Sequence, residues 1–313
     1  MKTIATVLAV GTALFTLASP AVADDAKPVD TQANFEADTD LPDEDIPAFT
    51  PSFAASRAGA VVDLWPTKNN FSTTFGGELQ LRVAPKLFLD LSYQAAFAHV
   101  GDAIDAGDNL GFGNPTLGVH FADAPARHFS YFLGASLTAP VLQDPSDEAG
   151  NAAFYGQRNR GYYDADRFVK GHMAARLAVG MELQGARPFI LRGEVRPVVY
   201  IPTSNKHPAF PKDRTGLPTT DAGDTAVTVE HALDLELRAD VGFGGGLRLQ
   251  GVFMPTQDDM LQLVAEPFLQ IAPRRQGFYA RVGFPVAVDE DLGFGLTGED
   301  KLAAIRVNIG GQW

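Results

Sequence analysis

The sequence predicts an all-β chain that closes into a transmembrane antiparallel β-barrel of twelve strands. Three observations predict this fold. Apolar and polar residues alternate in short segments from residue 57 to residue 313, and successive residues of a strand point to opposite faces. An export signal precedes these segments. No later segment has the run of about 20 apolar residues that a membrane-spanning helix needs. Together these features indicate a barrel whose outer surface contacts lipid.

Residues 1–23 have the three parts of a cleaved signal peptide. Lys2 supplies the positive charge, residues 4–17 are mostly apolar, and Ala21-Val22-Ala23 is a small-residue cleavage motif. We therefore expect the mature chain to begin at Asp24 and to reach the outer membrane of a Gram-negative-type bacterium.

Residues 24–50 are strongly acidic. They carry nine Asp and Glu residues against a single lysine, Lys27, so we expect a disordered N-terminal arm. The net charge of −13 argues against nucleic-acid binding. The absence of cysteine excludes disulfides and thiolate metal sites, and the six histidines are scattered. We expect no metal and no cofactor.

Residues 51–313 form the barrel, and residues 87–97 are its clearest strand. Leu87, Leu89, Leu91, Tyr93, Ala95 and Phe97 share one face, and more polar residues alternate with them. Only Ala84-Pro85-Lys86 separates this strand from the one before it, which predicts a tight hairpin. The twelve expected strands are centred on residues 58–64, 77–83, 87–97, 117–121, 129–137, 173–181, 189–199, 229–241, 247–253, 261–271, 278–284 and 303–313.

The expected connections fall into two classes. Those after the even-numbered strands are short, whereas residues 100–113, 142–168 and 202–224 form long loops. Outer-membrane barrels place short turns on the periplasmic side and long loops outside. An even strand count returns both termini to the periplasmic side.

The last strand ends on an aromatic residue, Trp313. Its alternating residues resemble the C-terminal strand of bacterial outer-membrane β-barrels, which implies recognition by the barrel-assembly machinery. We expect an aromatic girdle at each interface: near the periplasmic turns Phe129, Phe189, Phe243, Phe278 and Trp313, and near the opposite rim Trp65 and Phe97.

Ionisable residues occupy the expected inner face. The candidate lumen residues are Lys170, His172, Arg176, Arg192, Glu194, Arg196, Glu230, Asp234, Glu236 and Arg238. Two interpretations remain open. The charges either satisfy one another as an ion-pair lattice, or they line a polar lumen and act on a passing solute.

The loop 142–168 is rich in aromatic residues and arginines. The candidate extracellular contacts are Tyr155, Arg158, Arg160, Tyr162 and Tyr163. Side chains of these types suit contact with a partner. A loop folded over to narrow a pore would use them equally well.

A lipid-modifying enzyme is a third interpretation, which the residues do not favour. Some outer-membrane barrels of this size resemble lipid hydrolases with Ser and His on the outer wall. His99 and His231 are expected to face outward, but no serine follows either of them two residues later. His128 has that spacing to Ser130, which is expected to point inward. The sequence also has no G-x-S-x-G motif. We expect no catalytic residues.

Two stretches carry a family resemblance. Residues 111–118 read GFGNPTLG, and residues 132–140 read FLGASLTAP. They resemble an outer-membrane family associated with a meta-cleavage pathway of phenol degradation, although Asn114 stands where that family usually has Asp. The resemblance implies a barrel that helps small, often apolar, molecules across the outer membrane.

The sequence therefore predicts a passive outer-membrane channel or transporter for small solutes, apolar or aromatic ones among them. The alternative is a plugged barrel that uses its long loops for structure or for contact with partners at the surface.

Overall fold

The computed structural model describes residues 49–66, 70–100, 107–126, 128–142, 147–158, 162–185, 189–210, 221–239, 241–255, 260–288 and 304–313. The expected signal peptide and nearly all of the expected acidic arm lie outside these residues. None of the helices in the described part is long and apolar enough to cross a membrane.

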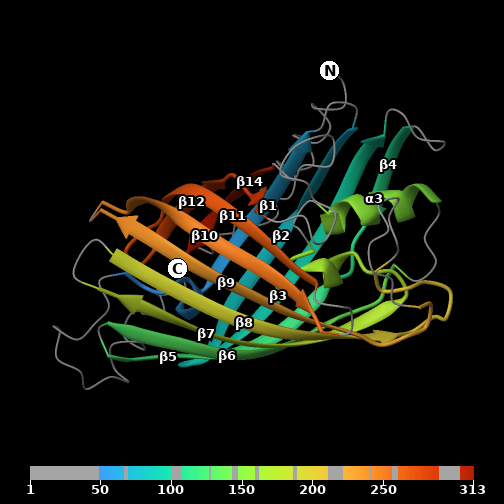
Figure 1. The fold of residues 1–313 in the computed structure, drawn as a ribbon. Helices are drawn as coiled ribbons and strands as arrows, with labels where there is room; N and C mark the ends of the chain where they lie inside the picture. The colour runs from blue at the N-terminus through green and yellow to red at the C-terminus, as the bar shows by residue number, and fades with distance from the viewer. Residues whose placement is uncertain are drawn as a thin grey trace, which may run out of the picture.

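The described residues form a closed antiparallel β-barrel (Figure 1). Its strands are β1 (Arg57–Pro66), β2 (Asn70–Ala84), β3 (Leu87–Val100), β4 (Gly107–Phe112), β5 (Thr116–Ala126), β6 (Phe129–Thr138), β7 (His172–Gln184), β8 (Phe189–Pro202), β9 (Ala226–Arg238), β10 (Phe243–Met254), β11 (Met260–Ile271), β12 (Gly277–Gly283), β13 (Val286–Ala287) and β14 (Ile305–Gln312). β1 pairs with β14, and β10 pairs with β11, so the sheet has no break between its first and last strands.

These fourteen segments form twelve strands of the barrel, because two of the barrel strands each consist of two consecutive segments. β4 and β5 both pair with β3, one beyond the other, and β12 and β13 both pair with β11. The predicted twelve-stranded fold class is confirmed.

The expectation of one long loop over residues 100–113 was wrong. Residues 107–112 are β4, which forms one barrel strand together with β5. This barrel strand is interrupted at Gly113-Asn114-Pro115, where proline has no N–H to donate. The Gly113 N–H donates to Gln94 O, and the Asn114 N–H donates to Arg167 O. A local alternation pattern does not reveal a strand this short.

The outer face of the wall is apolar, as predicted. On β3, Leu87, Leu91 and Tyr93 are exposed, whereas Phe88 and Gln94 point inward and are buried. Exposed aliphatic and aromatic side chains recur on the strands next to β3, which are β2, β4 and β5. In water such a surface would be unfavourable, but it matches a lipid environment.

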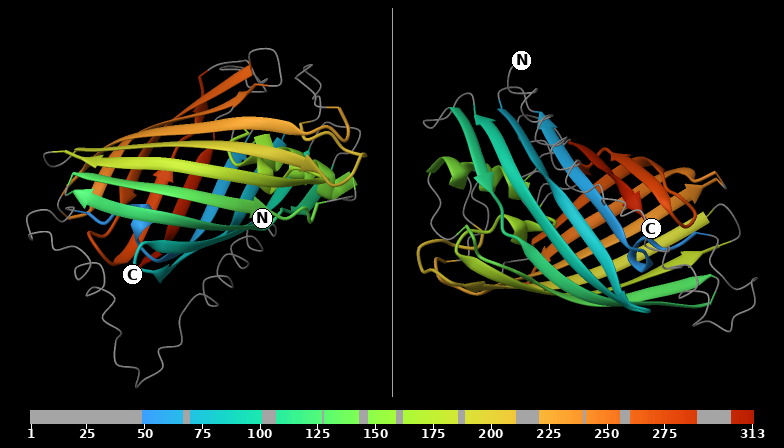
Figure 2. Two further views of the ribbon diagram at one scale, coloured as in Figure 1. Left: turned by 90° about the horizontal axis from the view of Figure 1, so that it is seen from below. Right: turned by 180° about the vertical axis from the view of Figure 1, so that it is seen from behind.

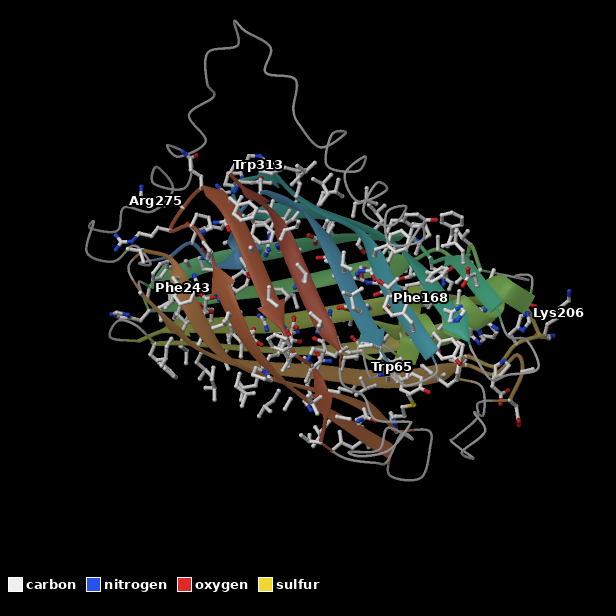
Figure 3. The ribbon with its side chains drawn as sticks, turned by 90° about the horizontal axis from the view of Figure 1, so that it is seen from above. Trp65, Phe168, Lys206, Phe243, Arg275 and Trp313 are labelled. Atoms are coloured by element: carbon white, nitrogen blue, oxygen red, sulfur yellow. The ribbon has the colours of Figure 1, made fainter. Side chains whose placement is uncertain are left out.

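The two classes of connection are also present. The turns β2–β3, β5–β6, β7–β8, β9–β10 and β11–β12 are short, and the longest connections, β6–β7 and β8–β9, lie at the other end. Figure 3 shows Phe243, Arg275 and Trp313 at the end with the short turns, and Lys206 at the opposite end. We call these the turn end and the loop end.

The expected aromatic residues lie on the outer face at the turn end, and at the loop end Phe97 is on the outer face but Trp65 is not. Phe189, Phe243 and Trp313 are exposed, but Trp65 points into the barrel and is buried. The alternation of β1 explains this placement, because Val61 and Asp63 share the inward face with Trp65.

Two segments outside the wall fill part of the barrel. One is the stretch from Phe49 to Ser56, with the short helix η2 (Ser52–Ala54). The other belongs to the β6–β7 connection and contains α3 (Asp147–Arg158) and η3 (Ala165–Arg167). Figure 2 shows α3 beside the loop-end parts of β3 and β4.

Candidate functional site: the barrel lumen

The lumen holds a cavity of about 480 Å³ between the two filling segments. Its boundary includes Ser52 and Phe53 of the N-terminal stretch at one end and Tyr163 and Asp164 of the β6–β7 connection at the other. The rest is lined by inward side chains of the wall, which strand alternation places at every second position. The cavity is large enough for a small organic molecule.

The β6–β7 connection folds inward because small residues let α3 lie close to the wall. A Cβ on Gly111 of β4 would lie 2.7 Å from Ala149 O, and one on Gly156 would lie 3.1 Å from the Cβ of Ala96 in β3. Ala152 and Phe168 are fully buried in the same contact. The glycines of the GFGN stretch thus permit close backbone approach, because they have no Cβ.

Asn114 holds the inward connection at both of its ends. Its Nδ2 donates to Asp166 O (3.1 Å) and to Val169 O (2.8 Å), and its Oδ1 accepts from Leu142 N (3.0 Å). A carboxylate could not donate either of the first two bonds. The hydrogen bonds to Asp166 O and Val169 O therefore require Asn at position 114, where the resembled family usually has Asp.

Two residues of the connection have left-handed backbone conformations, Tyr162 (φ 62°) and Asp164 (φ 59°). This region is uncommon for residues other than glycine. The contacts of Asp164 hold it there, because its N–H donates to Glu230 Oε1 at 3.0 Å and its carboxylate lies 3.1 Å from both Arg176 and Arg196.

Further ion pairs join the connection to the wall. Asp166 pairs with Arg176 of β7 and accepts a hydrogen bond from Thr138 at 2.6 Å. Arg167 reaches Glu78 of β2 at 3.0 Å. Burial, together with Glu194, raises the pKa of the Tyr163 phenol, which therefore stays protonated and donates to Glu194 at 2.6 Å.

A second group of ion pairs runs around the wall. Arg192 contacts Glu182 (2.6 Å) and Asp234 (3.7 Å), and Arg248 contacts Glu194 (2.9 Å). On β12, Arg281 lies 3.1 Å from Asp234 and 3.2 Å from Glu266. On β14, Arg306 lies 2.6 Å from Glu266 and 2.8 Å from Asp63. Such pairing offsets the cost of removing charge from water.

The stretch from Phe49 to Ser56 crosses the lumen at the turn end. The Phe49 backbone exchanges two hydrogen bonds with the Gln184 amide, and Arg238 lies over the Phe49 ring. His120 binds Phe53 O at 2.7 Å. The expected barrel domain, residues 51–313, therefore contains a lumen segment before its first strand.

The loop end of the lumen is apolar. Trp65, Val198, Tyr200 and Met254 of the wall are buried against Tyr162 and Phe210, which come from two connections. The described lumen thus has an apolar layer, a charged middle, and a floor formed by the N-terminal stretch.

The structure places almost all of the expected lumen residues inside. His172, Glu230, Asp234, Glu236 and Arg238 are buried, and Arg176, Arg192, Glu194 and Arg196 line the cavity. Lys170 lies in the turn before β7 rather than on a strand. The register of β8 and β9 places Arg192 opposite Asp234 and Arg196 opposite Glu230.

The expected extracellular contacts need a correction. Tyr162 and Tyr163 are buried in the lumen, because the connection folds inward, and Tyr155 packs beside Trp65. The Arg158 side chain and Arg160 lie outside the described part of the chain.

Several lumen charges were not identified from the sequence. Arg248, Glu266, Arg281 and Arg306 stand at alternating polar positions of β10, β11, β12 and β14, so the strand pattern could have revealed them. Asp164 and Asp166 lie in an irregular segment, where no local signal marks them.

The histidines considered for lipid hydrolysis lie in separate places. His99 is exposed and pairs with Asp108 at 2.8 Å, and His231 lies on the outer face of β9. Ser130 is buried on the inner face.

Comparisons with known proteins give the same fold. No family model and no curated protein matches the chain. An outer-membrane channel from Pseudomonas putida F1 has a TM-score of 0.54 at 12% identity, covering 88% of this chain and 100% of the channel. The fold is that of an outer-membrane β-barrel.

Two further structures match less closely. The NanC porin has a TM-score of 0.44 at 8% identity, covering 83% of this chain and 99% of the porin. The β-domain of the Bordetella autotransporter BrkA has a TM-score of 0.46 at 11% identity, covering 83% of this chain and 100% of that domain.

Proposed function

We propose that this protein is an outer-membrane channel that lets small solutes cross passively through its lumen. The observation that carries the proposal is the cavity of about 480 Å³, which lies inside a closed wall with an apolar outer face. A structural barrel has no need of such a space, because a small barrel can be filled by its own side chains.

The two filling segments would restrict the passage. The cavity is bounded by the β6–β7 connection towards one end and by the N-terminal stretch towards the other. Ion pairs and hydrogen bonds hold both segments, so we expect the resting channel to conduct weakly.

Planar-bilayer recording tests the proposal. The purified protein should give small single-channel currents, and removal of residues 143–166 should raise them, because this deletion takes α3 and Asp164 out of the lumen. A deletion of residues 211–220, in the β8–β9 connection, is a control that removes none of the described residues lining the cavity. A protein silent both intact and without residues 143–166 would contradict the channel and favour the plugged barrel.

The same proposal includes export and assembly. The signal peptide should be cleaved after Ala23, and the strand ending at Trp313 should direct assembly into outer-membrane lipid. N-terminal sequencing of the membrane-associated protein should begin at Asp24. Retention of Met1, or recovery in the cytosol, would contradict this route.

A further inference from the structure

The surface of the lumen cavity is richer in arginine than the lumen as a whole. Nine arginines and five carboxylates line it. Eight of these arginines stand on wall strands. Six of the eight form the ion pairs considered next: Arg176, Arg192, Arg196, Arg248, Arg281 and Arg306. Their side chains are between 10% and 19% exposed.

Most of the carboxylates that pair with these arginines do not reach the cavity surface. Six of their carboxylate partners have side chains that are 0–1% exposed, and none of the six lines the cavity. They are Asp63, Asp166, Glu182, Glu230, Glu236 and Glu266. Five of these carboxylates stand on wall strands and Asp166 stands on the β6–β7 connection. They fix the guanidinium groups in place from outside the cavity, and the guanidinium groups form the surface that a solute would touch.

Some of these guanidinium groups keep unused donors. Among the described residues, Nε of Arg248, Nε of Arg281 and Nη2 of Arg306 are buried and have no hydrogen-bond partner. A buried donor without a partner costs about 1–3 kcal/mol. These three atoms are closed off from the cavity, so a solute would contact the other, partly exposed guanidinium nitrogens.

Arg57 is the clearest of these cationic groups. It lines the cavity and lies over the ring of Tyr279, with its Cζ 4.3 Å from the ring centre. No carboxylate among the described residues pairs with it. Tyr279 lies flat against the wall because it crosses Gly59 and Gly310, where a Cβ would come within 2.1 Å and 2.6 Å of its hydroxyl.

Apolar side chains complete the lining. Phe53, Phe132 and Tyr163 present rings to the cavity, and Val61 presents an aliphatic group. A fully hydrated inorganic ion would leave these groups without a partner. A solute with both an anionic group and an apolar body would use both parts of the surface.

We propose that the cavity binds a small organic anion, with its carboxylate on Arg57 and the neighbouring guanidinium groups and its apolar body against the rings. As an account of the solute that passes through the barrel, this inference rests on the proposed function. Recognition comes from directed, charge-assisted hydrogen bonds, because the buried carboxylates cancel much of the long-range field of the arginines.

Three probes of one shape test the charge preference: 4-fluorobenzoate, 4-fluorobenzamide and 4-fluorobenzamidinium, which are anionic, neutral and cationic. Their binding to the purified full-length mature protein in detergent is measured by fluorine NMR. The benzoate should bind at least about tenfold more tightly than the amide, which corresponds to the loss of one charge-assisted hydrogen bond. The benzamidinium should bind most weakly.

Arg57→Gln tests the site, because Arg57 holds no ion pair with the described wall and its loss should leave the barrel folded. It should weaken benzoate binding by about tenfold and leave amide binding unchanged. Arg57→Lys should restore part of the affinity. The matched control is Arg275→Gln, at an exposed turn outside the cavity, which should change nothing.

The outcomes separate this inference from the channel. Equal binding of benzoate and amide, preference for benzamidinium, or an unchanged benzoate affinity in Arg57→Gln would overturn the anion site, even in a barrel that conducts. Selective benzoate binding that Arg57→Gln weakens would support the site, and a bilayer recording that stayed silent would then count against the channel alone.

Discussion

On the outer face of β3, Leu87, Leu91 and Tyr93 are more than 40% exposed, whereas on its inner face Phe88 and Gln94 are each 1% exposed. The two faces alternate along the same strand, but they are specified differently. The outer face needs only side chains that lipid accepts, and many apolar residues meet that condition. The inner face needs particular partners, most of them far away in the sequence, because hydrogen bonds and ion pairs depend on direction and distance. The effect of a substitution on the inner face should therefore depend on which partner loses its contact. The effect of a substitution on the outer face should depend on its depth in the membrane.

The largest effect should come from removing one carboxylate that serves two arginines. Glu266 contacts Arg281 at 3.2 Å and Arg306 at 2.6 Å. Glu266→Leu should lower the free energy of unfolding by about 3–5 kcal/mol, since it leaves buried charge uncompensated. Reversible urea unfolding in lipid vesicles measures the change. Glu266→Gln removes the charge but keeps the side-chain volume and an acceptor, so it should cost less. Equal losses in the two variants would show that the acceptor contributes nothing and that the lost charge accounts for the whole effect.

A charge on the outer face should have the next largest effect. Leu89→Arg should cost about 2–4 kcal/mol if Leu89 lies near the bilayer midplane. Asp90→Ala should cost less, although Asp90 contacts His120 at 2.5 Å on the inside. The same vesicle unfolding experiment compares them. Equal losses, or a greater loss at Asp90, would mean that the inner and outer faces of β3 are exchanged.

Asn114→Asp should loosen the inward connection without unfolding the wall. Two donated hydrogen bonds are lost, and a carboxylate is brought close to two carbonyl oxygens, so we expect a local cost of about 1–3 kcal/mol. Faster proteolysis between residues 142 and 168, with larger bilayer currents, would reveal it. Asn308→Asp adds the same charge to the cavity lining and should not have this effect. Unchanged proteolysis in Asn114→Asp would rule out the role of Asn114 as a clamp.

The smallest effect should be on ion preference. Asp234→Asn with Glu236→Gln should move the reversal potential across a salt gradient towards anions, and Arg192→Gln with Arg196→Gln should move it towards cations. The shifts should be modest, because each group is already paired in the wall. Shifts of the same sign in both double variants would contradict a role of these residues in selectivity.

The wall could be predicted from the sequence to a large extent. Alternation in segments such as residues 87–97 specified the strands, their outer faces and the strand count, because strand periodicity is a local property. Connection lengths separated the two ends of the barrel. The lumen charges on β7, β8 and β9 followed from the same pattern, since a residue that alternates with apolar neighbours must point inward.

Only the tertiary structure decided what fills the lumen. The sequence predicts a long loop over residues 142–168 and leaves open whether it contacts a partner or folds over to narrow the pore. In the structure Tyr163 and Asp164 bound the cavity, because their partners Glu194, Arg176 and Arg196 stand on β7 and β8. Asn114 looked like a departure from a pattern until its hydrogen bonds to the inward connection were visible. Such contacts join residues that are distant in the sequence, so no local periodicity marks them, and they become defined only when the closed wall brings them within hydrogen-bonding distance.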